Sequence, residues 1–383
     1  MYLQSQSFYI NGINKTETML RKLLFLALML GLAPTAKGQD TEALLDKIRD
    51  LESRIQSMRY SFQSLEKSID DVAWYHKLGD QAYIDKVELT GPPLGAEKGK
   101  AMGGGYNPVY YTNPLRIKTY VFIPKDIEPD KKYPLLVLPH GGVHSDFNTG
   151  YAHIVRELIA QHYIVVAPEY RGSTGYGSTY YRAIDYGGLE IQDVKACRDY
   201  MLENYSLVDE DRIGILGWSH GGLITLMNIF EYPDEYDVAY AGVPVSDLIA
   251  RMGYKTDGYR RLYSVDYHIG KTAHEDPEEY QRRSPAWNAG KLQDTPLLIH
   301  TNTNDADVGV LEVEHLIKAL KAADKDFEYE IYEDQPGGHR FDRMDTRNAK
   351  EIRLKVYRFL ARELNPDRPF KDLQALQLAS YGF

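Results

Sequence analysis

One serine of the sequence lies in a motif that supports nucleophilic chemistry. Ser219 stands at the centre of a G-x-S-x-G motif, GWSHG, over residues 217–221. The apolar run before it, RIGILGW, predicts a strand, and the segment after it, GGLITLMNIF, predicts a helix. A serine at such a strand-to-helix turn presents its hydroxyl for attack, and Gly217 and Gly221 leave room for a strained backbone. We therefore expect Ser219 to be a nucleophile rather than an ordinary turn serine.

A serine hydroxyl needs a general base, and the base needs a carboxylate that fixes its tautomer. Both residue types follow downstream, in the order serine, acid, histidine. Asp305 follows the apolar run TPLLIHTNT, so we expect it at the carboxyl end of a strand, where an open α/β sheet places its site. His339 lies in the glycine-flanked loop QPGGHRF after the next predicted strand. Asp307 is a rival acid, and either aspartate could instead cap the helix that follows.

Donors for a developing oxyanion are expected from two turns. One donor is the backbone N–H of His220, next to the nucleophile. The other comes from the turn His140-Gly141-Gly142 after the predicted strand PLLVLP, where bare glycine amides suit an oxyanion hole and Gly142 is the preferred donor. His140 and His144 could instead bind a metal, but the turn glycines oppose a shared helical face and no H-E-x-x-H pattern accompanies them. We expect no metal and no cofactor.

The elements that must position these residues follow an α/β pattern. From Tyr133 onward, short apolar runs alternate with longer amphipathic ones, which predicts a mostly parallel sheet with helices on both faces. Turn-rich sequence with β-branched residues from about residue 80 predicts antiparallel edge strands ahead of that sheet. A polar, Tyr-rich segment over about 249–289 interrupts the pattern and predicts an inserted lid. We therefore expect one α/β domain over 78–383.

The first 38 residues predict targeting rather than folded structure. After an upstream extension, the stretch 19–38 carries Arg21 and Lys22, an apolar run over 23–32 and a small-x-small site at 36–38, which is typical of a signal peptide. The apolar run is short for a membrane span, and an uncleaved anchor is the alternative. We expect a periplasmic or secreted protein without a stable membrane anchor.

Composition narrows the class of protein further. The chain has 383 residues, of which 43% are hydrophobic, and this is enough to bury a large core. Its formal net charge of −10 argues against a nucleic acid as partner. Cys197 is the single cysteine, so neither an intrachain disulfide nor a thiolate metal cluster can form. Its place in a predicted helix favours a buried, inert thiol.

Between the targeting segment and the α/β domain, residues 39–77 predict a long amphipathic helix. Its apolar residues alternate steps of four and three, which defines a heptad seam. Mostly isoleucine at a and leucine at d resembles a parallel two-stranded coiled coil, in which Lys47 could pair with Glu52 of the other strand but Arg54 would face Arg59. We expect either a homodimer through 44–72 or packing of the apolar face on the chain's own domain. The seam consists of Ile48, Ile55, Phe62 and Ile69 at a, with Leu44, Leu51, Met58, Leu65 and Val72 at d.

Several segments together resemble the catalytic domain of the prolyl oligopeptidase family of serine peptidases, within the α/β-hydrolase superfamily. They span about residues 115–363 in the order that the fold requires: PHGGVHSDF, APEYRGSTGYG, GWSHGG, AGVPVSDL, NDADV and GGHRF. The resemblance implies an α/β-hydrolase fold with Ser219 as nucleophile, Asp305 as acid and His339 as base. It also implies an oxyanion site at the N–H of His220 and the HGG turn.

The chain departs from this family in two places. Family peptidases usually carry an N-terminal β-propeller that restricts access and anchors the amino terminus of the substrate, whereas a heptad-patterned helix stands here. Exopeptidase specificity is therefore not carried over. His140 occupies a position where several members place an oxyanion-binding tyrosine, which leaves the second donor open. The chain is most similar to the single-domain, exported branch of the family.

These features predict a serine hydrolase that cleaves short peptides or aminoacyl amides through an acyl-enzyme. A carboxylesterase acting on acylated small molecules or polysaccharides follows the same path, and a non-catalytic coiled-coil interaction protein is a further alternative. Substrate contacts are expected from Trp218, Tyr170, Arg171 and the tyrosines of the lid. Trp218 could instead pack beneath the turn, and Arg171 could form a structural ion pair with Asp193 or Glu190.

Overall fold

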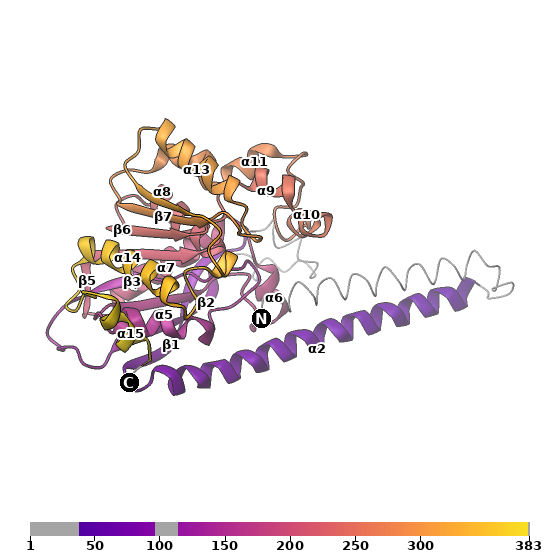
Figure 1. Cartoon of the computed structure of the whole chain (residues 1–383). Helices are drawn as coiled ribbons and strands as arrows, with labels where there is room; N and C mark the ends of the chain where they lie inside the picture. Colours follow the sequence, from indigo (N-terminus) through magenta and orange to yellow (C-terminus); the bar gives the residue numbers. More distant parts are fainter. Residues whose placement is uncertain (1–37, 96–113, 382–383) are drawn as a thin grey trace. The chain divides into compact units, whose positions relative to one another are not determined.

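The computed structural model describes residues 38–95 and 114–381, and the expected signal peptide lies almost entirely outside these residues (Figure 1). The chain divides into two compact units, Met1–Arg59 and Tyr60–Phe383. Helix α2 (Gly38–Leu78) belongs to both units, because the boundary falls within it. The helix expected over 39–77 is thus present, but its second half belongs to the larger unit, which begins before residue 78.

In the described part of the chain, the larger unit is built on an eight-stranded sheet with the order β1-β2-β4-β3-β5-β6-β7-β8 (Figure 1). Strand β2 runs antiparallel to β1 and β4, and the other neighbouring strands are parallel. The predicted mostly parallel sheet with antiparallel edge strands is confirmed. The strands are β1 (Ala82–Pro93), β2 (Pro114–Pro124), β3 (Tyr133–Val137), β4 (Ile164–Glu169), β5 (Val208–Trp218), β6 (Val238–Gly242), β7 (Leu297–Asn302) and β8 (Glu328–Tyr332).

Helices cover both faces of this sheet because the central strands are apolar on both sides. On β4, Ile164 and Val166 enter a core shared with α7, α8 and α13, whereas Val165 and Ala167 enter a second core shared with α5, α14 and α15. Cys197 of α7 is buried in the first core, as expected. The covering helices are α5 (Ala152–Ile159), α7 (Leu189–Asn204), α8 (His220–Glu231), α13 (Val310–Ala322), α14 (Arg347–Leu364) and α15 (Leu373–Tyr381).

A helical insertion separates β6 from β7, at the place of the expected lid. Asp247 caps its first helix by accepting hydrogen bonds from the N–H groups of Ile249 and Ala250. A buried ion pair of 2.8 Å between Arg251 and Glu312 attaches this helix to α13. None of the described helices is both long and apolar enough to cross a membrane. The insertion contains α9 (Leu248–Tyr254), α10 (Asp257–Ser264), α11 (Pro277–Arg282) and α12 (Pro285–Asn288).

The second half of α2, residues 60–78, packs on the rest of the larger unit through the face opposite to its heptad seam. Trp74 and Leu78 are fully buried, and Lys67 is only 4% exposed. Residues 67 and 74 occupy f positions of the heptad, which point away from a and d. The expectation that the apolar face packs on the chain's own domain is therefore wrong for residues 60–78. The seam side chains of this half are between 56% and 70% exposed: Phe62, Leu65, Ile69 and Val72.

Candidate active site

Ser219 lies at a sharp turn between β5 and α8, as its motif predicts. Its backbone has φ 61° and ψ −121°, a conformation that costs a non-glycine residue about 1–3 kcal/mol. Three backbone hydrogen bonds hold it there. The Ser219 N–H donates to the Gly242 oxygen (3.0 Å), and the N–H groups of Leu223 and Val245 donate to the Ser219 oxygen (3.1 Å each). A Cβ atom on Gly221 would lie 2.3 Å from the Pro139 oxygen, so this position requires glycine. The predicted strand-turn-helix is confirmed.

The structure brings Asp305 and His339 into direct contact. His339 Nδ1 lies 2.6 Å from Asp305 Oδ2, while Asp305 Oδ1 accepts hydrogen bonds from the N–H groups of Asp307 (2.8 Å) and Val308 (2.9 Å). Burial works to raise the pKa of Asp305, but the hydrogen bonds from His339 and the two amides outweigh it and hold the pKa below its usual value. Asp307 is exposed. The geometry thus favours Asp305 over its rival as the partner of the histidine.

This contact also determines the state of the imidazole. A carboxylate at Nδ1 holds a proton on that nitrogen, which leaves the lone pair on Nε2, the form that a general base requires. The loops of the acid and the base are tied together by Asn302 at the end of β7, whose amide donates to the oxygens of Gln335 (3.0 Å) and Gly338 (3.1 Å). Sequence reasoning missed Asn302, because no motif around this residue indicates that its hydrogen-bond partners lie more than 30 residues further along the chain.

The glycine turn after β3 passes beside the nucleophile. A Cβ atom on Gly141 would lie 3.4 Å from the Cβ of Ser219. The N–H of Gly141 donates to the hydroxyl of Tyr151 (2.9 Å), a residue that the sequence did not single out. Of the two glycine amides, we therefore keep that of Gly142 as the expected oxyanion donor. This role, like that of the His220 N–H at the start of α8, stays a prediction.

The side chain of His140 does not take the place of an oxyanion-binding tyrosine. Its Nε2 lies 2.9 Å from Ser173 Oγ, its Nδ1 lies 3.0 Å from the Gly141 oxygen, and its ring stacks on Tyr170 at 4.2 Å. Burial lowers the pKa of His140 to about 3, so the ring is neutral. Both ring nitrogens already have partners, so we correct the assignment of this side chain to the oxyanion hole. The ring of His144 has other partners, and its Nε2 lies 3.0 Å from Nε2 of His268.

The three residues expected to bind substrate are buried instead. Trp218 is 1% exposed and packs beneath the turn, where its Nε1 donates to Asp342 Oδ2 (2.5 Å). Arg171 and Tyr170 are fully buried, and Arg171 donates from Nε and Nη2 to the two oxygens of Asp193 at 2.7 Å each. The guanidinium therefore has a structural ion pair, one of the alternatives that the sequence left open. We correct the assignment of all three to substrate binding.

Tyr186 connects the elbow to tyrosine rings of the insertion. The ring of Tyr186 lies 4.4 Å from that of His220, and Tyr263 of α10 lies 4.6 Å from Tyr186. Arg251 of α9 donates to Tyr259 at 2.8 Å, and Tyr259 is hydrogen-bonded to Tyr263 at 2.6 Å. Tyr259 and Tyr263 of the expected lid thus form an aromatic cluster with Tyr186, and Tyr186 lies next to the residue that follows the nucleophile.

Two known proteins with similar sequences carry the names of peptidases. The model of the prolyl oligopeptidase family matches residues 150–367. The uncharacterized peptidase YuxL of Bacillus subtilis is 31% identical over 214 residues, covering 55% of this chain and 32% of that protein. Human dipeptidyl peptidase 8 is 31% identical over 224 residues, covering 55% of this chain and 24% of that protein. The chain therefore spans about a quarter to a third of the length of these relatives.

Solved structures of the same kind share the fold. A puromycin-hydrolyzing peptidase of Mycobacterium tuberculosis superposes with a TM-score of 0.59 at 21% identity, covering 74% of this chain and 39% of that one. An acylaminoacyl peptidase of Pyrococcus horikoshii superposes with a TM-score of 0.58 at 18% identity, covering 79% of this chain and 45% of that one. The expected α/β-hydrolase fold is confirmed. With its family model matched over more than half of its length, the chain belongs to the prolyl oligopeptidase family.

Proposed function

We propose that this protein is a serine hydrolase that cleaves short peptides or aminoacyl amides through an acyl-enzyme on Ser219. The observation that carries the proposal is the 2.6 Å contact between His339 Nδ1 and the buried carboxylate of Asp305, in the same fold as the strained Ser219 elbow. A histidine held in this way is prepared to take a proton from a serine hydroxyl.

The proposed reaction has two halves. Ser219 Oγ attacks the carbonyl carbon while His339 Nε2 takes the hydroxyl proton, and the N–H groups of His220 and Gly142 stabilise the resulting oxyanion. Collapse of this intermediate breaks the carbon–nitrogen bond, and His339 gives its proton to the leaving amine. Water then attacks the acyl-enzyme with His339 again as base, and the carboxylic acid and free Ser219 are released.

The preference for amide substrates rests on the relatives. Dipeptidyl peptidase 8 and the acylamino-acid-releasing enzyme of Arabidopsis thaliana, which is 29% identical over 253 residues, carry names that refer to amide bonds of peptides. Ester substrates would follow the same chemical path. We place the specificity of this chain in the insertion, whose partly exposed Tyr259 is hydrogen-bonded to the buried Tyr263 of the aromatic cluster beside His220.

The test combines an active-site probe with a substrate panel. A fluorophosphonate probe should label the wild type and should fail to label Ser219→Ala. A wild type that stays unlabelled would exclude the serine hydrolase and favour a non-catalytic interaction protein. The panel compares aminoacyl and dipeptidyl amides with acetyl and feruloyl esters. A preference for the esters by kcat/KM would replace the peptidase proposal by a carboxylesterase.

We also propose that the protein is exported to the periplasm or secreted. The basic and apolar run over 19–38 supports this, although residues 1–37 lie outside the described part. Expression of the full chain followed by cell fractionation and N-terminal sequencing tests it. We expect the mature amino terminus near residue 39, and an intact amino terminus on protein in the cytoplasmic fraction would contradict export.

We further propose a homodimer in which the heptad seam of α2 pairs with that of a second copy. The seam side chains are exposed, the opposite face of residues 60–78 already packs on the rest of the larger unit, and isoleucine at a with leucine at d suits a parallel two-stranded coil. The doubly substituted Ile55→Glu/Phe62→Glu protein should be a monomer by light scattering, whereas the f-position control Ser53→Glu should stay dimeric. A monomeric wild type would rule the dimer out.

A further inference from the structure

The face of α2 that lies opposite to the heptad seam contacts the chain segment 140–151, which includes the glycine turn beside Ser219. We infer that Lys67 and Trp74 are positioning residues of the active site, which hold this segment in the place that catalysis requires. The inference rests on the proposed function, because the catalytic role of the glycine turn does. Helix α2 would then support the reaction in addition to the dimerisation proposed for its seam.

Lys67 binds the segment at its centre. Its ammonium group donates to the Phe147 oxygen at 2.6 Å, lies 3.2 Å from Asp146 Oδ2, and forms a buried ion pair with Glu169 of β4. Glu169 in turn accepts a hydrogen bond from the Phe147 N–H at 3.1 Å and lies 3.5 Å from Nε2 of His140. Burial works to lower the pKa of Lys67, but the carboxylates of Glu169 and Asp146 outweigh it and raise the pKa, so the amine is charged. One ammonium group thus organises the segment around Phe147.

Trp74 reaches the glycine turn through two stacked rings. Its ring stacks on Phe147 at 5.3 Å with an interplanar angle of 5°, and Phe147 stacks on Tyr151 at 4.9 Å and 20°. The hydroxyl of Tyr151 accepts the hydrogen bond from the Gly141 N–H. Gly141 is the residue whose added Cβ would lie 3.4 Å from Ser219. A continuous series of contacts therefore joins α2 to Gly141, in the turn that passes beside the nucleophile.

Two further contacts show that α2 lies tightly against this region. Asp70 accepts hydrogen bonds from the N–H (3.1 Å) and the hydroxyl (2.7 Å) of Thr149. A Cβ atom on Gly175, in the neighbouring loop, would lie 2.7 Å from the Cβ of Lys67. The helix is thus in contact with the segment at several consecutive turns, and a shift of α2 would be transmitted to it.

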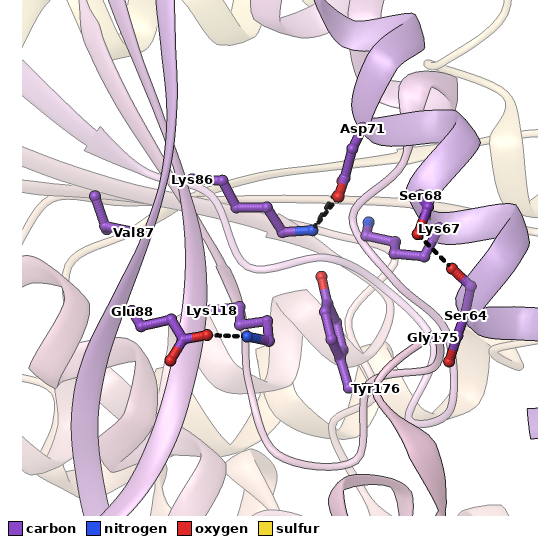
Figure 2. Close-up of a pocket in the computed structure, with 10 residues that line it drawn as sticks. All are labelled: Ser64, Lys67, Ser68, Asp71, Lys86, Val87, Glu88, Lys118, Gly175 and Tyr176. Atoms are coloured by element: carbon purple, nitrogen blue, oxygen red, sulfur yellow. Dashed lines mark hydrogen bonds and ion pairs between the residues drawn. The ribbon is translucent and has the colours of Figure 1, made fainter. Parts of the chain in front are cut away.

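A second lysine, Lys86, provides a matched control for Lys67, and both line a cavity of about 330 Å³ (Figure 2). Figure 2 shows Lys67 and Asp71 of α2 on one side of it and Lys86 of β1 on the other. The Lys86 amine forms an ion pair with Asp71 at 2.6 Å, which also attaches α2 to the sheet but does not involve the segment 140–151. Lys86→Met therefore removes an attachment of the same helix by the same substitution.

The experiment compares Lys67→Met, the conservative Lys67→Arg and the control Lys86→Met in the full chain. The readouts are kcat and KM on a small chromogenic substrate, the thermal unfolding midpoint, and hydrogen exchange of peptides that cover 140–151. Asp70→Ala is a milder fourth variant, because Asp70 is partly exposed and its loss threatens folding less than the loss of a buried ammonium group.

We expect Lys67→Met to lower kcat about 10- to 100-fold with KM changed less than about threefold, because a displacement of about 1 Å near the reacting atoms has effects of this size. Exchange over 140–151 should become faster, and Lys67→Arg should recover most of kcat. Asp70→Ala should lower kcat by a smaller factor. Lys86→Met should lower the unfolding midpoint while kcat and the exchange of 140–151 stay as in the wild type.

The inference is overturned if Lys67→Met and Asp70→Ala keep the wild-type kcat, or if Lys86→Met lowers kcat as much as Lys67→Met does. If Lys67→Met does not fold, Asp70→Ala decides alone. A wild type without hydrolase activity would refute the proposed function instead. Hydrogen exchange still decides the positioning role in that case, because an unchanged exchange rate over 140–151 in the variants would refute it.

Discussion

Replacing Asp305 by asparagine tests the assignment of the acid, because the structure determines how the new amide must be oriented. Asp305 Oδ1 accepts two backbone N–H groups, those of Asp307 and Val308, and Oδ2 faces His339 Nδ1. An asparagine has one oxygen, and the two N–H donors require that oxygen at the Oδ1 position. The NH₂ group must then face His339 Nδ1, where it acts as a donor.

This orientation forces the wrong tautomer on the histidine. Nδ1 must accept the hydrogen bond from the new amide, so the proton moves to Nε2, which can no longer act as base toward Ser219. Loss of the correct tautomer in a serine triad lowers kcat by about 10⁴, which corresponds to a barrier about 5 kcal/mol higher. The residual rate should come from the oxyanion donors and substrate binding.

The assay measures kcat for Asp305→Asn and for the control Asp307→Asn on the best substrate of the panel. Thermal unfolding of both variants shows whether each is folded. We expect the control to keep kcat within about threefold, because Asp307 contributes only its backbone N–H to the site. An Asp305→Asn enzyme that keeps more than a tenth of kcat would refute the tautomer argument, and a larger loss in Asp307→Asn would reverse the assignment of the acid.

Three further predictions address the glycine turn, the buried ion pair and the pH dependence of stability. In Gly141→Ala the new Cβ would lie 2.9 Å from the backbone oxygen of Trp218, so the turn must move and kcat should fall about 10²- to 10³-fold. Gly290→Ala, where the Cβ meets open space, is the control, and equal kcat in both variants would show that the turn has no catalytic role. Arg171→Met should lower the free energy of unfolding by about 3–5 kcal/mol in denaturant titrations, because it leaves Asp193 buried and unpaired, while KM stays unchanged. A tenfold rise in KM without loss of stability would instead support the original assignment of Arg171 to substrate binding. Burial lowers the pKa of His300 to about 4, so between pH 6.5 and 4 the unfolded chain binds a proton there that the folded chain does not, and stability falls as the pH falls. His300→Phe removes this contribution, so the wild type should lose about 2 kcal/mol more than the variant between pH 7 and pH 5; parallel losses in the two proteins would contradict the assigned pKa.

The sequence predicted those parts of the site that local patterns encode. The elbow at Ser219 follows from a strand, two glycines and a helix within about twenty residues, and the positions of Asp305 and His339 follow from the ends of successive strands. The mostly parallel sheet followed in the same way from alternating apolar and amphipathic runs. Each of these predictions needed only residues that are close together in the chain.

Contacts between distant segments were beyond sequence reasoning. The heptad pattern predicted that the apolar face of α2 would be the face that packs, yet the face that packs on the domain contains Lys67. A lysine can be buried there because Asp146 and Glu169 compensate its charge. Those carboxylates lie about 80 and 100 residues further along the chain. Arg171 gave the same difficulty, since its motif suggested a substrate contact and only the fold could choose between Asp193 and Glu190.

The place of β3 in the sheet limits how this protein can be divided. The family match begins at residue 150, whereas β3 ends at Val137 and pairs with both β4 and β5 in the interior of the sheet. A fragment trimmed to 150–367 would lack an internal strand together with β1, β2 and the glycine turn, so β4 and β5 would lose their shared neighbour. Inactivity of such a fragment would reflect a broken sheet and would carry no information on catalysis. Given the positioning role that we infer for Lys67, the smallest unit suitable for enzymology should start within α2, ahead of that residue.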